Sequence, residues 1–413
     1  HYAYHGYWTE DFTKLNPHLG TEEDFVELIN KAEEKGIKII LDGVFNHTGS
    51  DSIYFNKNSR FDSVGAYESL SSPYYEWYDF KSYPDQYTCW WDIEILPRIN
   101  IQNHSCSDFF VGKKGVIKKY ADMGIDGFRL DVVDELGDNF IEKIKSTLGK
   151  NKNASILYGE VWEDASNKIA YSTRKRYYLG SELDGVMNYP IRRGIIDYLA
   201  EQKTDSLNYA LTEVTRNAPE RIMHAQMNLL GTHDTERILT VLAADKAAGN
   251  SNSELSKKRM TKAQRTLGIR RLKLAYTILA TLPGIPAIFY GDEAGLEGYG
   301  DPFNRMPYPW GHENKDLLDF YKKIGIIRRN NNVYIDGEFV LNHLDSEFFI
   351  FTRKKGKTAI VTAVNNSQRP LSLNFLNSAK AQIVSKNSKK FVLNPLSVEI
   401  YKTKTGNTLT VDA

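Results

Sequence analysis

Four carboxylates each follow a separate apolar segment of the sequence: Asp42, Asp131, Glu160 and Asp234. Arg129 stands two residues before Asp131, so on a strand both side chains point to the same side. A neighbouring guanidinium lowers the pKa of a carboxyl group, and an ionised carboxylate is what a nucleophile requires. Glu160 lies among Tyr158, Val161 and Trp162, and apolar surroundings raise the pKa of a carboxyl group, which suits proton donation.

Two carboxyl groups driven toward opposite protonation states are typical of a retaining glycosidase, provided that they lie about 5–5.5 Å apart. Asp234 follows His233, so its negative charge could stabilise a cationic transition state while the histidine binds sugar hydroxyls. One aspartate at a strand end is more often structural than catalytic. Four carboxylates at the same rim of one barrel would favour catalysis.

The elements that would position these residues alternate between helix and strand. Thr21 and Asp24 form a variant capping box for a helix that Gly36 ends, and residues 37–42 read as a buried strand. The same order recurs in two more helix–strand pairs, 109–123 with 125–131 and 140–148 with 155–160, and further strands are expected at 185–188, 226–230 and 287–290. Six such strands favour a parallel (β/α)8 TIM barrel, whose active site lies at the carboxyl ends of its strands.

Two regions depart from this alternation. Residues 46–108 are rich in Tyr, Trp, Ser and Pro, and this length predicts an inserted subdomain B between barrel residues 1–45 and 109–332. In residues 333–413, short strands at 338–342, 348–353, 359–364 and 398–401 predict a C-terminal all-β sandwich. A closed barrel needs eight strands, and the chain opens in loop-like sequence, so we expect the first two strands to be missing.

Composition narrows the possible partners. The chain has 413 residues, and 53 basic against 52 acidic side chains give a net charge of +1, which does not favour nucleic acid or an anionic membrane. No apolar run approaches the length of about 18 residues that a membrane helix needs, and residues 1–10 lack a signal-peptide pattern. Two cysteines exclude a disulfide framework, and whether Cys89 and Cys106 pair stays open.

Four segments, in this order, resemble the signature segments of the α-amylase family, glycoside hydrolase family 13. They are Asp42-Gly43-Val44-Phe45-Asn46-His47, Gly127-Phe128-Arg129-Leu130-Asp131, Gly159-Glu160-Val161-Trp162 and Asn228-Leu229-Leu230-Gly231-Thr232-His233-Asp234. Residues 4–8 look like the loop after the second barrel strand, and residues 284–293 look like the eighth strand. The resemblance covers nearly the whole chain.

The resemblance implies a role for each matched position. Asp131 would be the nucleophile, Glu160 the general acid/base and Asp234 the stabiliser of the transition state, while Asp42 would support the site through hydrogen bonds. The implied substrate-binding residues are His5, His47 and His233 on the hydroxyls of the −1 sugar, Tyr7 beneath that sugar, Arg129 beside the nucleophile, Asp301 and Arg305 at the −1 or −2 subsite, and Trp162 beyond −1. Trp90, Trp91 and Trp162 have two equal interpretations: platforms for sugars at subsites beyond −1, or packing between the subdomain and the barrel.

Within the family, Leu96-Pro97-Arg98-Ile99-Asn100 is similar to a segment of the neopullulanase, cyclomaltodextrinase and amylopullulanase group. Many secreted α-amylases bind calcium between barrel and subdomain through an asparagine like Asn46 and an aspartate that would align near Arg98. A cation at that position repels calcium, which prefers carboxylate and carbonyl oxygens. We therefore expect neither calcium at this site nor any other cofactor, and Arg98 would tie the two parts together instead.

The resemblance implies a retaining hydrolase of starch, pullulan or maltooligosaccharides that cleaves α-1,4 bonds, while cleavage of α-1,6 bonds stays open. The alternatives are a non-catalytic amylase-like glycan-binding protein, which would have lost some of the carboxylates present here, and a transglycosylase of the same fold. The linkage preference, endo or exo action and the oligomeric state stay open. Because polymeric glucans do not enter cells, an extracellular or surface location is favoured over a cytoplasmic one.

Overall fold

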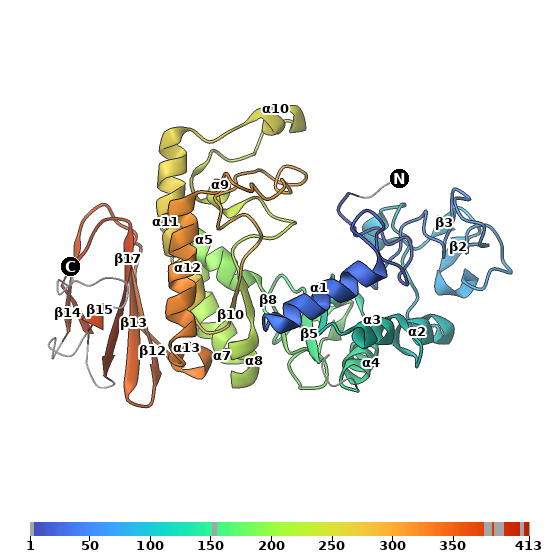
Figure 1. The fold of residues 1–413 in the computed structure, drawn as a ribbon, viewed down its shortest axis with the longest axis horizontal. Coiled ribbons are helices and arrows are strands. Elements are labelled where there is room, and N and C mark those ends of the chain that lie inside the picture. The colour runs from blue at the N-terminus through green and yellow to red at the C-terminus, as the bar shows by residue number, and fades with distance from the viewer. Residues whose placement is uncertain (1–3, 151–154, 376–381, 384–391, 405–408, 413) are drawn as a thin grey trace. The chain divides into compact units, whose positions relative to one another are not determined.

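The computed structural model describes residues 4–150, 155–375, 382–383, 392–404 and 409–412. It contains two compact units, His1–Val186 and Met187–Ala413 (Figure 1). None of the helices in the described part of the chain combines the length and the apolar character that crossing a membrane requires.

Parallel strands form the centre of the first unit. The strands are β1 (Ile40–Gly43), β4 (Gly127–Leu130), β5 (Ile156–Gly159) and the beginning of β8 (Gly185–Asn188), each hydrogen-bonded to the next. The close approach of β4 and β5 explains why residue 127 is a glycine, because a Cβ atom there would lie only 1.9 Å from the carbonyl oxygen of Ile156. The parallel ladder is the one that the helix–strand alternation predicts.

Helices of the first unit confirm some predicted boundaries and correct one. Helix α1 (Glu22–Glu34) begins with the predicted capping box of Thr21 and Asp24, and Gly36 follows its end with a φ of +69°. The single helix predicted for 109–123 is wrong, because the structure has two helices separated at residues 112–115. The helices of this unit after α1 are α2 (His104–Val111), α3 (Val116–Met123), η3 (Val133–Glu135) and α4 (Asp138–Leu148).

A physical reason for the break between α2 and α3 lies in its two glycines. Gly112 adopts an extended conformation, and a Cβ atom there would lie 2.4 Å from the carbonyl oxygen of Asp108. Gly115 precedes α3 and is equally crowded by the carbonyl oxygen of Phe110, at 2.5 Å from a Cβ position. Two glycines three residues apart therefore end one helix and begin the next.

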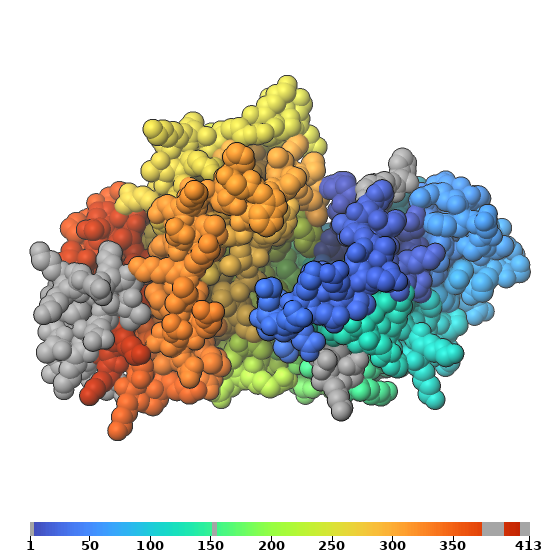
Figure 2. All heavy atoms as spheres, in the orientation of Figure 1, coloured from blue at the N-terminus to red at the C-terminus, as the bar shows by residue number. Residues whose placement is uncertain are grey.

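The segment 46–108 of the first unit contains little regular structure and is packed through aromatic rings. Its elements are η1 (Tyr75–Trp77), β2 (Phe80–Ser82), β3 (Gln86–Tyr87) and η2 (Trp90–Asp92). Phe55 is fully buried and contacts the rings of Tyr78 and Tyr87 at 4.8 and 4.7 Å between centroids. In Figure 2 much of this segment, in light blue, forms one end of the unit. Cys89 and Cys106 are free thiols.

The second unit continues the parallel pairing. Here the end of β8 pairs with β9 (Met227–Leu229), and β9 pairs with β10 (Ile285–Ala287). The strand predicted at 287–290 is thus displaced toward the N-terminus, since Ile285 already faces Met227 and the chain turns at Gly291 with a φ of +86°. The helices are α5 (Tyr189–Glu201), α6 (Asp205–Tyr209), the π-helical η4 (Ala210–Val214), α7 (Thr215–Asn217), α8 (Glu220–Ala225), α9 (Ile238–Ala243), α10 (Asn252–Lys257), α11 (Lys262–Thr281), α12 (Lys315–Arg329) and α13 (Val333–Asp336).

Two antiparallel sheets follow α13 and form the predicted sandwich. One has the order β11-β12-β13-β17-β15 and the other β16-β14-β18. Their bounds are β11 (Glu338–Leu344), β12 (Phe348–Lys355), β13 (Thr358–Asn365), β14 (Leu371–Phe375), β15 (Gln382–Ile383), β16 (Val392–Leu393), β17 (Ser397–Lys404) and β18 (Leu409–Asp412). Apolar side chains of both sheets, including Phe348, Leu371 and Leu393, form one buried cluster. The four predicted strands correspond to β11, β12, β13 and β17.

The other face of the larger sheet packs on helices of the same unit. Phe349, Phe351 and Ile360 share a buried cluster with α5, α11 and α12, and Figure 1 shows this sheet beside α11 and α12. Arg353 is fully buried there and donates hydrogen bonds to the carbonyl oxygens of Gly337 and Thr281. The predicted boundaries at 46, 109 and 333 stay predictions, while the sandwich and the second-unit helices share a core.

Candidate active site

Arg129 is the centre of a cluster of three carboxylates in the first unit. Its Nη1 atom donates to Asp42 Oδ1 at 2.8 Å and to Asp131 Oδ1 at 3.0 Å, and Nη2 lies 2.8 Å from Glu160 Oε2. Burial opposes the charge of the guanidinium, but the carboxylates outweigh it, Asp42 and Glu160 most, and raise the pKa of Arg129. Arg129, which stays charged, therefore contacts all three carboxyl groups.

Strand register explains how these side chains meet. Asp42 pairs with Arg129 across β1 and β4, and Arg129 pairs with Tyr158 across β4 and β5. The ladder extends one residue further, because the Asp131 N–H donates to the Gly43 carbonyl at 3.1 Å and the Glu160 N–H donates to the Leu130 carbonyl at 3.0 Å. Asp131 and Glu160 thus leave the sheet at the carboxyl ends of adjacent strands, as the sequence predicts.

Beyond Asp131 the chain takes a conformation that no sequence pattern indicates. Val132 has a φ of +41°, in the left-handed region that β-branched residues rarely adopt. In this conformation the Val132 N–H donates to Glu160 Oε2 at 2.9 Å. Backbone strain of this kind is found where a site requires it. Here it directs a backbone donor from the segment after the nucleophile toward the predicted acid/base residue.

Glu160 has more polar surroundings than its neighbours in sequence predict. Its side chain is 4% exposed, yet Oε2 faces Arg129 and the Val132 N–H. The other oxygen, Oε1, accepts a hydrogen bond of 3.1 Å from Trp162 Nε1. Trp162 is 47% exposed, so its indole both orients the carboxyl group and presents a surface to solvent.

Three predicted sugar-binding residues lie together beside Asp42. The Tyr7 hydroxyl donates to Asp42 Oδ2 at 2.7 Å, and the rings of Tyr7 and His5 stack with centroids 6.1 Å apart. His47 Nε2 donates to the Tyr7 carbonyl at 2.9 Å. Asp42 supports the site through hydrogen bonds, as expected, since it accepts from both Tyr7 and Arg129.

Protonation of two of these side chains is fixed by their surroundings. Burial, reinforced by the charge of Asp42, raises the pKa of Tyr7. The phenol therefore stays protonated and can donate a hydrogen bond. Burial lowers the pKa of His47 to about 4, so its ring is neutral near pH 7. Each is therefore a neutral hydrogen-bonding group, suited to sugar hydroxyls.

The remaining predicted residues form a second cluster, within the second unit. His233 Nε2 lies 3.0 Å from Asp234 Oδ2, and Arg305 Nη2 lies 3.0 Å from Asp301 Oδ2 and 3.8 Å from Asp234 Oδ1. The structure thus brings together His233, Asp234, Asp301 and Arg305. That Asp234 shares one rim with Asp131 and Glu160 stays a prediction of the sequence.

Two residues that organise this second cluster were not predicted as functional. Asn304 is fully buried, and its Nδ2 donates to the carbonyl oxygens of His233 at 2.7 Å and Thr235 at 2.8 Å. Arg237, also fully buried, donates through Nε to the Asn304 carbonyl at 2.7 Å. Asn304 lies between Asp301 and Arg305 in sequence, and this proximity was the available signal.

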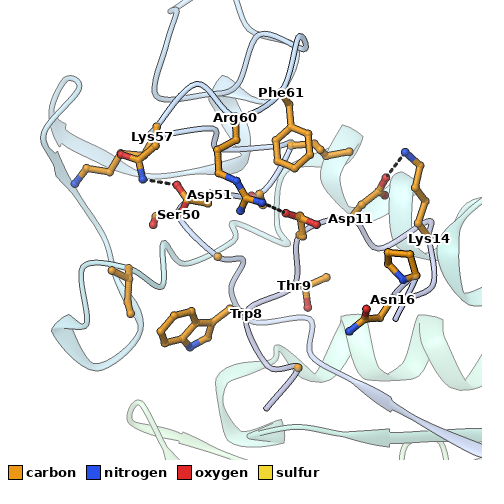
Figure 3. Close-up of a pocket in the computed structure, with 18 of the residues that line it drawn as sticks. Trp8, Thr9, Asp11, Lys14, Asn16, Ser50, Asp51, Lys57, Arg60 and Phe61 are labelled. Atoms are coloured by element: carbon orange, nitrogen blue, oxygen red, sulfur yellow. Dashed lines mark hydrogen bonds and ion pairs between the residues drawn. The ribbon is translucent and has the colours of Figure 1, made fainter. Parts of the chain in front are cut away.

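A cavity of about 710 Å³ lies in the first unit, between residues of the N-terminal loop and the segment 46–108 (Figure 3). Gly6 and Trp8, which flank Tyr7, border it together with Ser50, Asp51 and Arg60 from the segment 46–108. Its volume lies within the range of about 300–1,000 Å³ that small-molecule sites occupy. The edge of Trp8 also packs against His5, with centroids 5.0 Å apart. Open space therefore lies next to the predicted sugar-binding residues.

The position where many α-amylases bind calcium, and where we expect none, has both acidic and basic side chains around it. A second cavity, of about 550 Å³, is bordered by Asn46, Arg98 and three acidic side chains that follow β4. Each of these acids already faces a cation. The pairs are Asp134 with Lys168 at 2.9 Å, Glu135 with Arg98 at 4.0 Å and Asp138 with Arg176 at 3.2 Å. The fourth acid at this cavity, Asp79, accepts a hydrogen bond from Asn100, so that the absence of calcium stays a prediction.

Comparisons with known proteins agree with this geometry. The family model described as alpha amylase, catalytic domain, matches residues 2–332. An amylopullulanase of Thermoanaerobacterium thermosulfurigenes is 36% identical over 91% of this chain and 21% of its own length. A cyclomaltodextrinase of Thermoanaerobacter pseudethanolicus is 32% identical over 92% of this chain and 60% of its own length. The chain thus spans about a fifth and about three fifths of these two relatives.

Solved structures show the same fold. A debranching enzyme from Nostoc punctiforme superposes with a TM-score of 0.79, at 24% identity, over 98% of this chain and 84% of that one. A cyclic α-maltosyl-(1→6)-maltose hydrolase from Arthrobacter globiformis gives a TM-score of 0.78 at 24% identity, over 97% of this chain and 82% of that one. With the family model matched over residues 2–332 and the four signature segments in place, the chain belongs to the α-amylase family of glycoside hydrolases.

Proposed function

We propose that this chain is a retaining α-glucan hydrolase that acts through a covalent glycosyl-enzyme intermediate. The observation that carries the proposal is the contact of one buried guanidinium, that of Arg129, with both Asp131 and Glu160. These acids end adjacent strands and differ in their other contacts, because Glu160 accepts hydrogen bonds from Val132 and Trp162. Two distinct carboxyl groups are what a double displacement needs.

In the first step, an oxygen of Asp131 attacks the anomeric carbon and Glu160 gives its proton to the departing glycosidic oxygen. In the second step, Glu160 takes a proton from water, and that water attacks the same carbon and releases Asp131. Each displacement inverts the carbon, so the product keeps the α configuration. Arg129 stays charged throughout and holds the nucleophile in position while the charge of Glu160 changes.

Binding of the sugar would use the neutral groups beside Asp42. Tyr7 presents a ring and a phenol held by Asp42, and His47 is held by the Tyr7 carbonyl. We assign Asp234 to the stabilisation of the positively charged transition state, with His233 at its side. Arg305 keeps Asp301 oriented for sugar hydroxyls through their contact of 3.0 Å.

The substrate class follows from the relatives. The amylopullulanase and the cyclomaltodextrinase described above are 36% and 32% identical to this chain, and a neopullulanase of Thermoactinomyces vulgaris is 28% identical over 88% of it. We infer starch, pullulan or maltooligosaccharides as substrates, with cleavage of α-1,4 bonds, and the products from pullulan decide whether α-1,6 bonds are cleaved as well. We place the enzyme outside the cell or at its surface, because polymeric glucans do not enter cells, and expect no nucleic-acid partner at a net charge of +1.

Product analysis tests this function. We expect maltoheptaose to be shortened and the first products to carry the α configuration, as followed by proton NMR before mutarotation. With pullulan, panose would show α-1,4 cleavage and maltotriose α-1,6 cleavage. A preparation of the Asp131→Asn variant controls for contaminating amylase. Initial products of β configuration, or no new reducing ends from starch, pullulan or maltoheptaose, would refute the proposal.

We also propose that Arg98 replaces calcium as the tie between the segment 46–108 and the loop after β4. Support comes from its contacts, because Arg98 lies 4.0 Å from Glu135 and 5.6 Å from the ring of Tyr171, whose hydroxyl donates to Glu135. Its backbone also pairs with His47. Buried against Arg98, Glu135 would lose its counter-charge if that cation were removed.

Chelation distinguishes the two kinds of tie. We expect EDTA to change the Tm of the wild-type protein by less than about 1 °C, while Arg98→Ala lowers it by a few degrees, since a partly exposed ion pair contributes about 1 kcal/mol or less. Arg98→Lys should recover part of the loss. A clear fall in Tm with EDTA, restored by added calcium, would contradict the proposal.

A further inference from the structure

Three aromatic rings form a continuous stack that begins at a predicted sugar-binding residue. The ring of His47 stacks on Trp90 with centroids 5.3 Å apart and an interplanar angle of 26°. Trp90 stacks in turn on Trp91 at 4.8 Å and 14°. The stack thus leads away from His47 one ring at a time. It ends in Trp91, which is 71% exposed.

Backbone geometry holds this terminal indole in place. Trp91 and Asp92 both have positive φ angles, +48° and +57°, which are unfavourable for residues with a side chain. The loop that contains them is closed by hydrogen bonds between Trp90 N–H and the Leu96 carbonyl and between Leu96 N–H and the Ile93 carbonyl. Strained residues persist where the surrounding structure fixes them and often mark functional positions. Trp91 is therefore held outward by its loop.

Packing alone does not account for Trp91. One face of its ring lies on Trp90, and an exposed fraction of 71% leaves most of the indole in water. The same loop borders the cavity beside Tyr7 through Glu94 and Ile95, and Ile95 is itself 41% exposed. A flat aromatic surface next to open space suits the apolar C–H face of a pyranose ring. The cavity that Glu94 and Ile95 border, three and four residues after Trp91, is lined by polar groups that suit its hydroxyls.

We propose that Trp91 is a stacking platform for a glucose unit of a longer α-glucan, beyond the sugar that contacts His47. The proposal rests on the proposed function and extends it, because it makes Trp91 a determinant of chain-length preference. Short substrates that occupy only the positions near His47 would not reach this platform. Long ones would gain one stacked ring.

Binding to an inactive enzyme tests the platform without catalysis. In the Glu160→Gln background, we expect Trp91→Ala to weaken the binding of maltoheptaose, measured by calorimetry, by about ten-fold. The same change should alter maltose binding by less than about two-fold, because a short ligand does not reach the Trp91 ring and gains nothing from stacking on it. Trp91→Phe, which keeps an aromatic face, should recover part of the affinity.

Trp310→Ala is the matched control, because Trp310 is 80% exposed and also contacts another ring, that of Tyr308 at 4.5 Å. It should leave both affinities unchanged. Equal losses for maltose and maltoheptaose would show that Trp91 merely supports His47 and would overturn the platform, as would no loss for either ligand. A change in oligomeric state on Trp91→Ala, without a change in glucan affinity, would instead assign the surface to a protein contact and also overturn it.

Failure of the proposed function gives a different result. In that case the wild-type protein would cleave no glucan, whatever the behaviour of the Trp91 variants. If glucans are cleaved but Trp91→Ala has the same kcat/KM as wild type on maltoheptaose, only the platform is refuted. The two proposals can therefore fail independently.

Discussion

Replacing Asp131 by Asn is expected to lower kcat by about 10⁴-fold or more on any glucan that the wild-type enzyme cleaves. The amide has nearly the shape of the carboxylate, so it can keep its place beside Arg129, but its oxygen is a poor nucleophile. Asp131 is 6% exposed and accepts from Arg129 at 3.0 Å, so the change should disturb packing little. Initial rates on maltoheptaose and far-UV circular dichroism would measure the two effects.

Asp122→Asn offers a matched control, because Asp122 is exposed on α3 and pairs with Lys118 in the same helix. Its activity should equal that of the wild type. A further readout uses Asp131→Gly with azide as an external nucleophile. A single displacement inverts the anomeric carbon, so the product should be a β-glycosyl azide. Near-normal hydrolysis by Asp131→Asn would remove Asp131 from the mechanism.

Replacing Arg129 by Met should damage both stability and activity. The change leaves Asp131 and Glu160 buried without their common cation, and removal of one partner from a buried ion pair costs about 3–5 kcal/mol. We expect the free energy of unfolding at pH 7, measured with urea, to fall by about 3 kcal/mol. The value of kcat/KM should fall by at least about 10²-fold, because the nucleophile loses its orienting contact.

The Arg129→Lys variant checks the cause of these losses. Arg129→Lys restores the charge, but one ammonium cannot contact three carboxylates as the planar guanidinium does. It should therefore recover more stability than activity. A variant as stable and active as wild type would show that the three acids do not depend on Arg129.

Sequence patterns predicted the parts of the fold that depend on local chemistry. The capping box at Thr21, the parallel strands and the proximity of Arg129 to Asp131 all follow from residue types at short spacing. Four antiparallel strands of the sandwich were also predicted because their apolar runs are bounded by turns. The family resemblance predicted which polar residues would gather, and within each unit they do.

Features set by tertiary contacts were not predicted. The left-handed conformation of Val132 arises from the contacts that hold the segment after β4. It could not be predicted from the residue type, because valine rarely adopts a positive φ. The displacement of β10 depends on its register with β9. The aromatic stack of Trp90 and Trp91 on His47 joins residues more than 40 positions apart, so the sequence left sugar binding and packing as equal alternatives.

The shared core between the sandwich and α11 and α12 has a consequence for any attempt to prepare a shorter enzyme. Phe349, Phe351 and Ile360 pack into the same cluster as helices of the second unit, and the Arg353 guanidinium reaches the last residue of α11. A chain truncated before Glu338 would expose this apolar helical surface to solvent, and we expect it to aggregate. The sandwich is thus part of the hydrophobic core of the second unit, and any shortened chain prepared for expression has to include it.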